Sequence, residues 1–287
     1  MSRDLKGYFG AEPAPCWPNE ARLAVSFVVN VEEGAELSIG DGDERNEARY
    51  EAVEEVKGAP DPCMESHFGY GPRQGYRRIV EAFERYGVTA TFSTCGRAAE
   101  RTPWLIRDAV ERGHEVACHG WRWETHAGWD AGRERAVIAR THAALTEIAG
   151  IAPVGWHTRS ATSPHTRALL IEHGGFAYDS NAYDDDIPYM EGDHVVLPYA
   201  FDTNDMRFSP GGGFVQANWQ SNRLMQHYML SMLYTYPFSK ATPATETKMN
   251  CDADNHMTAQ SCSADRKYKQ HTGSALLPTT VRTHQTI

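Results

Sequence analysis

The sequence predicts an α/β fold in which a parallel sheet closes into a (β/α) barrel. Short apolar runs alternate with amphipathic helical segments along residues 1–216, and this alternation is typical of a parallel sheet. The 287 residues, of which 41% are hydrophobic, are enough to bury a large core. Polar residues follow every predicted strand, and only a closed barrel would bring all of them to one mouth. We therefore expect a barrel rather than an open sheet.

Each predicted strand is a short run of apolar residues, of the kind that a buried parallel strand requires. The first, Arg22 to Val31, reads RLAVSFVVNV and is almost continuously apolar. The other five are expected at 88–95, 114–118, 154–157, 176–179 and 194–199.

The helices between these strands show apolar residues at helical spacing and recognisable ends. They are expected at 71–87, 102–113, 133–150 and 163–175. The first should bury Ile79, Phe83 and Tyr86. Thr102-Pro103 and Ser163-Pro164 each offer a capping residue followed by a first-turn proline, and glycines end the helices.

Charge and composition argue against several classes of protein. The net charge of −10 opposes binding to nucleic acid or to an anionic membrane. No apolar run approaches the roughly 20 residues of a membrane helix, and the N-terminus lacks the apolar stretch of a secretory signal. The six cysteines include no CxxC pair, which favours reduced thiols. We expect a cytoplasmic protein without nucleic-acid or membrane partners, and leave open whether it forms a homo-oligomer.

The chain changes character near residue 216. Residues 1–216 contain 23 of the 24 glycines, and 34 acidic residues against 21 basic ones. Residues 217–287 contain one glycine, with four acidic and seven basic residues, and most of them lack helical or strand periodicity. We expect a barrel domain over 1–216 and an atypical, low-order tail over 217–287.

Two adjacent carboxylates, Glu32 and Glu33, directly follow the first predicted strand. Such a pair can divide its roles, one group acting on a reacting water and the other on a metal ion or a hydrogen-bond donor. The alternative is a solvated acidic turn, since further acidic residues follow nearby. Their place at the predicted mouth of the barrel makes them candidate catalytic residues.

A second candidate segment, His119 to His126, follows the third predicted strand and reads HGWRWETH. Gly120 would let the backbone approach a ligand closely, and Trp121, Arg122 and Trp123 could form a wall for a flat polar ligand. The two histidines are seven residues apart, unlike the spacing of about three to five in many zinc sites. A metal site built from this segment alone is therefore not expected.

Further polar residues follow the later strands. His157 and Arg159 could line the same mouth or serve a surface turn, and the run from Asp184 to Asp186 is expected to be solvated. Residues expected to bind substrate are Trp121, Trp123, His157, Asp179, Asn204 and Asp205. No nucleophile elbow or phosphate-binding glycine loop is present.

The order of five motifs resembles that of the polysaccharide deacetylase superfamily and is most similar to its branch of cofactor-independent allantoinases. The motifs are NVEEGAE (30–36), ACHGWRWE (117–124), GWHTRS (155–160), GGFAYDSNAYDDDIPY (174–189) and LPYAFDTNDMRF (197–208). The resemblance, over about residues 3–216, implies a distorted (β/α) barrel and hydrolysis of a non-peptide carbon–nitrogen bond.

The departures from the superfamily pattern point to the allantoinase-like branch. Sugar deacetylases of the superfamily carry paired aspartates at the positions of Glu32 and Glu33. They also carry a second metal-binding histidine where this chain has Trp123, whose indole nitrogen only donates. We expect no cofactor; if a divalent metal such as zinc is bound, Glu33 and His119 are its expected ligands.

The resemblance also implies a late strand ending in Leu-His, which residues 217–287 do not contain. We hypothesise that the reading frame or splicing departs from the family after about residue 216, so that the C-terminal part of the barrel is missing or replaced. Such a chain would lack part of its barrel wall and one catalytic group.

Three hypotheses for function follow. In the first, the chain hydrolyses a small cyclic amide or ureide, with allantoin the leading candidate. Glu32 or Glu33 would be the general base, and His119, Arg122 and Arg159 would stabilise the oxyanion. The second is a metal-dependent deacetylase of N-acetylated sugars, and the third is an inactive, truncated binding protein. Chelator sensitivity separates the first two, and turnover by this chain would exclude the third.

Overall fold

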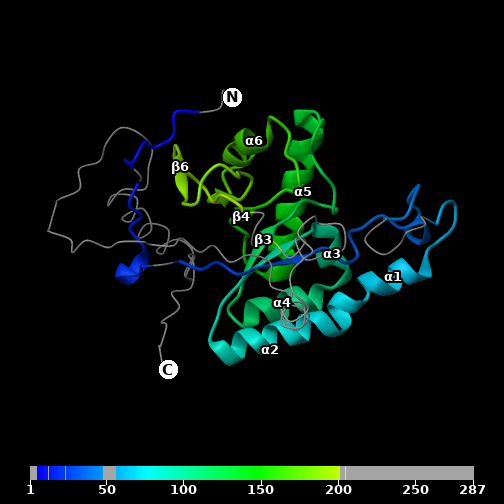
Figure 1. Cartoon of the computed structure of the whole chain (residues 1–287). Coiled ribbons are helices and arrows are strands. Elements are labelled where there is room, and N and C mark those ends of the chain that lie inside the picture. Colours follow the sequence, from blue (N-terminus) through cyan, green and yellow to red (C-terminus); the bar gives the residue numbers. More distant parts are fainter. Residues whose placement is uncertain (1–4, 12, 23, 48–55, 201–203, 205–287) are drawn as a thin grey trace, which may run out of the picture.

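The described residues form an α/β structure built on one sheet, as the sequence predicts (Figure 1). The computed structural model describes residues 5–11, 13–22, 24–47, 56–200 and 204. The strands are β1 (Val28–Val31), β2 (Thr91–Thr94), β3 (Glu115–Cys118), β4 (Gly155–Trp156), β5 (Tyr178–Asp179), β6 (Tyr189–Glu191) and β7 (His194–Val196). The α-helices are α1 (Pro62–Phe68), α2 (Tyr76–Tyr86), α3 (Gly96–Arg101), α4 (Pro103–Glu111), α5 (Ala131–Ala149) and α6 (Thr166–His173).

The seven strands are ordered β1-β2-β3-β4-β5-β7-β6. Every neighbouring pair is parallel except β6 and β7, which pair antiparallel across a tight turn. Within the described ranges, β1 and β6 are therefore the outer strands. Closure into a barrel, the domain boundary at 216 and the tail at 217–287 all involve residues outside these ranges, so those expectations stay predictions.

The core lies between the sheet and helices α2 to α6. Helix α5 packs against α3, α4 and α6, and Figure 1 shows it passing between α4 and α6. The largest fully buried apolar side chains are Phe92, Ile106, Ile138, Leu145, Trp156 and Leu170. Because Phe92 and Trp156 come from the sheet and the other four from helices, this core fixes the strand ends that position the candidate site.

The predicted helices are present, but Tyr86 and Thr102 do not have their predicted roles. Tyr86 is 66% exposed, because α2 instead buries Tyr76, Val80 and Phe83. Thr102 precedes α4 without capping it, since its hydroxyl donates to the carbonyl of Ala98.

Helix α6 begins three residues later than Ser163-Pro164 suggests. Ser163 forms hydrogen bonds on both sides of this turn, its backbone N–H donating to the Thr166 hydroxyl and its own Oγ accepting from the N–H of His165. Helices α1 and α3 and strand β6 were not predicted, because segments of three to seven residues show too little periodicity to reveal them.

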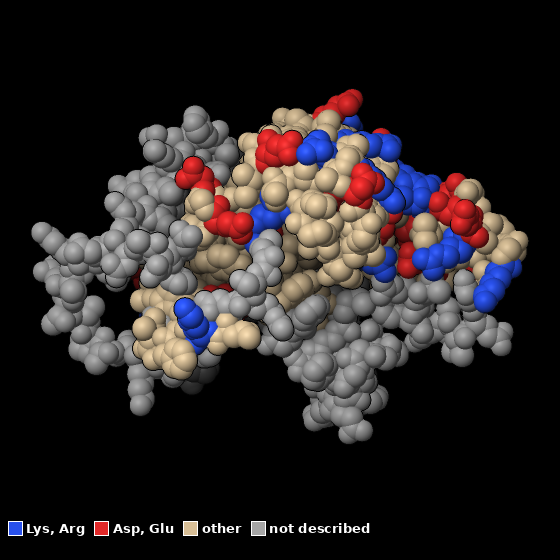
Figure 2. Space-filling model, turned by 90° about the horizontal axis from the view of Figure 1, so that it is seen from above, with Lys and Arg blue, Asp and Glu red and all other residues tan. Residues whose placement is uncertain are grey.

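The surface carries charges of both signs. Figure 2 shows Lys and Arg side chains lying among Asp and Glu side chains on one face of the described part. Exposed ion pairs such as Arg135–Glu172 and Arg112–Glu84 contribute to this mixture. Among the described helices, none combines the length and the apolar character needed to cross a membrane.

Candidate active site

The candidate site lies at the carboxyl ends of the parallel strands. Glu32 follows β1, His119 follows β3, His157 follows β4 and Asp179 ends β5. Backbone hydrogen bonds link the ends of neighbouring strands. The N–H of His119 donates to the carbonyl of Thr94, and the N–H of His157 donates to the carbonyl of Cys118. Parallel pairing thus puts these four positions at the same edge of the sheet.

Glu32 and His119 form the central contact of this edge. The Nε2 atom of His119 lies 3.1 Å from Oε1 of Glu32, and Nδ1 lies 2.8 Å from the carbonyl oxygen of His157. A carbonyl only accepts, so Nδ1 carries a hydrogen and a neutral ring would turn its Nε2 lone pair toward the carboxylate. A hydrogen bond between this nitrogen and the carboxylate oxygen needs one more proton, since each would otherwise only accept. Such a bond would place one proton between Nε2 of His119 and Oε1 of Glu32.

The backbone beside His119 is shaped by Gly120, which has a φ of +80°. This left-handed conformation strains any residue with a Cβ. An ideal Cβ here would also lie 3.4 Å from Nε2 of His126. Gly120 thus permits the turn that follows β3, and its expected close approach to a ligand stays a prediction.

His157 is a second, neutral imidazole beside this pair. Its ring lies 4.9 Å from that of His119 and stacks on Tyr199 at 4.8 Å. Burial, reinforced by His119, holds the pKa of His157 well below its usual value. Its Nδ1 is buried and has no hydrogen-bond partner among the described residues. Tyr199 also accepts a hydrogen bond from Asn204, which places that predicted residue beside the cluster, whereas Asp205 lies outside the described residues.

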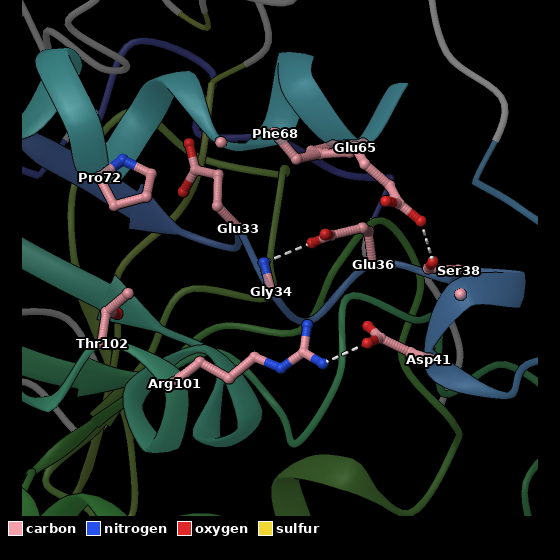
Figure 3. Close-up of a pocket in the computed structure, with 12 residues that line it drawn as sticks. Glu33, Gly34, Glu36, Ser38, Asp41, Glu65, Phe68, Pro72, Arg101 and Thr102 are labelled. Carbon is pink, nitrogen blue, oxygen red and sulfur yellow. Dashed lines mark hydrogen bonds and ion pairs between the residues drawn. The ribbon is translucent and has the colours of Figure 1, made fainter. Parts of the chain in front are cut away.

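Glu33 faces a pocket of about 320 Å³, and His119 is not among the residues that line this pocket (Figure 3). The pocket is lined by Glu33, Gly34, Glu36, Ser38, Gly40, Asp41, Glu65, Phe68, Gly69, Pro72, Arg101 and Thr102. Burial, with the neighbouring Glu32 adding to it, raises the pKa of Glu33 to about 7. The two adjacent carboxylates thus have different surroundings, and only Glu32 contacts the histidine.

The rest of this pocket is acidic but internally paired. Figure 3 shows Arg101 bound to Asp41, with an N···O distance of 2.6 Å, and the Ser38 hydroxyl donating to Glu65 at 2.9 Å. Glu36 accepts a hydrogen bond from the backbone of Gly34. These contacts hold the loop after β1 against α1 and α3.

Arg122 supports the same loop. Its two terminal nitrogens each lie 2.6 Å from an oxygen of Asp43, and it also donates to the carbonyls of Ala35 and Glu36. The pairing lowers the pKa of Asp43 to about 2. Arg122 thus packs against the loop that carries Glu32, and its three side-chain nitrogens all donate to protein groups.

The aromatic residues predicted to line the site pack against arginines. The guanidinium of Arg159 lies 3.8 Å from the Trp123 ring centroid, and one nitrogen donates to the Trp123 carbonyl at 2.7 Å. The Trp121 ring lies under Arg140 of α5, at 3.3 Å, and against Gly96 of α3. Trp121 therefore fills the contact between α3 and α5 instead of contacting the Glu32–His119 pair.

Asp179 is fully buried and held by protein groups. Its carboxylate accepts from Arg167 and His194, each at 2.9 Å, and from the backbone of Asn181 at 3.0 Å. Burial alone would raise its pKa, but the bonds from His194 and Arg167 lower it. Asp179 joins α6 and β7 to the end of β5.

One buried cluster was not foreseen. His126 donates to Glu134 of α5 at 2.8 Å, and Glu134 also accepts from the hydroxyls of Ser163 and Thr166. Both His126 and Glu134 are fully buried. The cluster anchors the segment after β3, which carries His119, to α5 and α6. Nothing in the local sequence signals it, because its partners are eight to forty residues apart.

The donor set does not fit the metal site of the sugar deacetylases. Trp123 occupies one ligand position and is buried under Arg159, and Glu33, named above as a conditional ligand, lines a pocket that His119 does not line. Within the described ranges, no group of three or more His, Cys, Asp or Glu side chains is arranged to hold a metal ion.

Comparison with known proteins gives consistent matches. The family model for polysaccharide deacetylase matches residues 57–176. A Schizosaccharomyces pombe protein called "Putative polysaccharide deacetylase" is 32% identical over 246 residues, covering 76% of this chain and 75% of that protein.

Two crystal structures are also similar over most of the chain. A structure described as "Puue Allantoinase" is 38% identical with a TM-score of 0.69, covering 79% of this chain and 76% of its own. A "probable Polysaccharide deacetylase" from Pseudomonas aeruginosa PAO1 is 40% identical with the same TM-score, covering 79% and 77%.

Proposed function

The chain belongs to the polysaccharide deacetylase family of carbon–nitrogen hydrolases, and from this premise we propose that it hydrolyses a small cyclic amide or ureide without a resident metal ion. Allantoin is the leading substrate. The observation that supports this most strongly is the direct contact of Glu32 with His119, at a site where Trp123 replaces a ligand. The similarity to an allantoinase structure agrees with it.

The proposed chemistry uses the proton held between Glu32 and His119. Glu32 accepts a proton from water as the water oxygen bonds to the substrate's carbonyl carbon. The protonated imidazole of His119 stabilises the resulting oxyanion. The carbon–nitrogen bond then breaks, and the proton passes to the leaving nitrogen, so that the ring opens to a carboxylic acid and an N–H group. The backbone carbonyl of His157 holds the His119 ring in place by accepting a hydrogen bond from its Nδ1–H.

The other predicted residues have supporting roles in this proposal. Arg122 holds the loop that carries Glu32, through Asp43. Arg159 and Trp123 form one wall of the mouth, and Asn204 and Asp205 stay predicted substrate contacts. Asp179, fully buried and paired with Arg167 and His194, orients protein side chains instead of contacting substrate. Glu33 stays a candidate alternative base, because a carboxyl with a pKa of about 7 is partly ionised at neutral pH.

Separate replacement of the two carboxylates tests these assignments. Glu32→Gln should lower kcat for allantoin by about a hundredfold or more, the usual contribution of a general base. Glu33→Gln should lower it less, and Glu111→Gln, on the exposed face of α4, should leave it unchanged. If Glu32→Gln keeps full activity and Glu33→Gln loses it, the roles are reversed. If both keep full activity, neither is the base.

A second candidate is metal-dependent deacetylation of N-acetylated sugars, which the names of the fungal and Pseudomonas relatives favour. It predicts that activity on an acetylated chitooligosaccharide disappears with a chelator and returns with zinc. Allantoin hydrolysis that persists in the chelator would favour the first candidate.

A further inference from the structure

Two histidines face each other where α5 packs against α6. His142 lies on α5, and His173 is the last residue of α6. Their ring centroids are 4.6 Å apart, at an interplanar angle of 57°. Phe176 lies against both rings, at 5.2 Å from His142 and 5.1 Å from His173. The pair is separate from the residues that the proposed reaction uses.

The ring of His142 presents a lone pair. It donates one ring N–H to the carbonyl of Pro153, while its Nε2 is buried and has no hydrogen-bond partner among the described residues. The donor is therefore Nδ1, and Nε2 of the neutral ring is unprotonated. Burial, followed by the neighbouring His173, lowers the pKa of His142, which keeps the ring neutral near pH 7.

The Nδ1 atom of His173 borders the same space, and a backbone donor occupies its lone pair. This Nδ1 accepts from the backbone N–H of Gly175 at 3.3 Å. An ideal Cβ on Gly175 would lie 2.9 Å from Nε2 of His142 and 2.9 Å from Nδ1 of His173. Both nitrogens thus border the space that the missing side chain of Gly175 leaves open.

We propose that His142 and His173 form a two-histidine site for a divalent transition metal ion of the zinc, nickel and copper group. Neutral imidazole suits these ions. A ligating histidine commonly donates its other N–H to a carbonyl, as His142 does to Pro153. His173 is exposed, so its ring can release the 3.3 Å hydrogen bond from Gly175 and turn to bring both nitrogens within the usual metal–nitrogen distance of about 2.1 Å. Water completes the coordination, and the ion clips α5 to α6.

Titration with Ni²⁺ tests the site in the full chain. The chain is stripped with a chelator, dialysed free of it and titrated at pH 7.5 by isothermal calorimetry. His173→Ala removes one ligand from an exposed helix end, and Gly175→Ala keeps both imidazoles but puts a methyl group between them. Both should weaken the tightest Ni²⁺ binding by about tenfold or more, since a bidentate site becomes monodentate or blocked. His67→Ala, which removes an exposed histidine of α1, is the matched control and should bind as the original chain does.

Circular dichroism establishes that each variant is folded before titration. Binding should also weaken from pH 7.5 to 5.5, because protonated imidazole cannot ligate a metal. Equal affinity in the original chain, His173→Ala and Gly175→Ala would overturn the proposal, as would absence of Ni²⁺ binding by the original chain.

Discussion

Replacing Glu33 with glutamine is expected to stabilise the protein at pH 8 but not at pH 5. The carboxyl faces the pocket beside α1, and burial raises its pKa from an ordinary value of 4.5 to about 7. The folded state therefore holds this proton more tightly than the unfolded state does. As pH rises above 4.5, the unfolded state releases the proton first, so the free energy of unfolding falls until the folded state has released it near pH 7.

The size of the effect follows from the two pKa values. The interval between 4.5 and about 7 corresponds to about 3 kcal/mol of lost stability once both states are ionised. Because the side chain keeps some exposure, this figure is an upper estimate. Glutamine has nearly the same shape and does not ionise. Glu33→Gln should therefore match the original protein at pH 5 and exceed its stability by up to about 3 kcal/mol at pH 8.

Urea denaturation at pH 5, 6, 7 and 8 measures this difference. Other groups that titrate in this interval, such as His142 and His157, contribute equally to both proteins and cancel in the comparison. Glu111→Gln, an exposed replacement on α4, should follow the original protein at every pH. A stability difference between Glu33→Gln and the original that stays constant from pH 5 to 8 would refute the reasoning.

Three further predictions concern the supports of the site. Glu134→Ala should lower the free energy of unfolding by about 3 to 5 kcal/mol in urea denaturation, because it strands the buried His126; a loss below about 1 kcal/mol would contradict this. Asp43 has a pKa of about 2, so its pairing with Arg122 stabilises the protein above about pH 4 and is lost as pH falls toward 2. In thermal melts between pH 4 and 2, Asp43→Asn should reduce the fall of Tm with decreasing pH. A fall of Tm equal to that of the original protein would count against the pairing. Trp156→Ala should lower the free energy of unfolding by about 3 to 5 kcal/mol, because the ring is fully buried. A smaller loss in calorimetry would show that the core relaxes around the missing ring.

Most of the sheet could be predicted from the sequence because short, largely apolar segments alternate with helical ones. The six strands expected between residues 22 and 199 all appear, although shorter than predicted. The missed strand β6 has three residues and pairs only with β7, so it has no pattern of its own. The start of α6 was misjudged because Ser163 bonds within the preceding turn and to buried Glu134.

The candidate site was predictable in its location but not in its contacts. Parallel strands bring Glu32, His119 and His157 to one edge, whatever their side chains do. Which of two adjacent glutamates would meet His119 depends on the direction of each side chain, and a dipeptide sequence does not contain that information. Likewise, Arg122 and Trp121 lie in the predicted segment, but their contacts are with residues distant in sequence. Arg122 pairs with Asp43, and the Trp121 ring packs under Arg140.

The most direct test of the proposed function is allantoin hydrolysis by the full chain after dialysis against a chelator. Turnover that survives the chelator and is lost in Glu32→Gln is the predicted result. Turnover that requires added zinc, or that occurs only on N-acetylated sugars, would contradict the metal-independent mechanism. Absence of turnover on either substrate by the folded chain would instead favour an inactive, truncated binding protein.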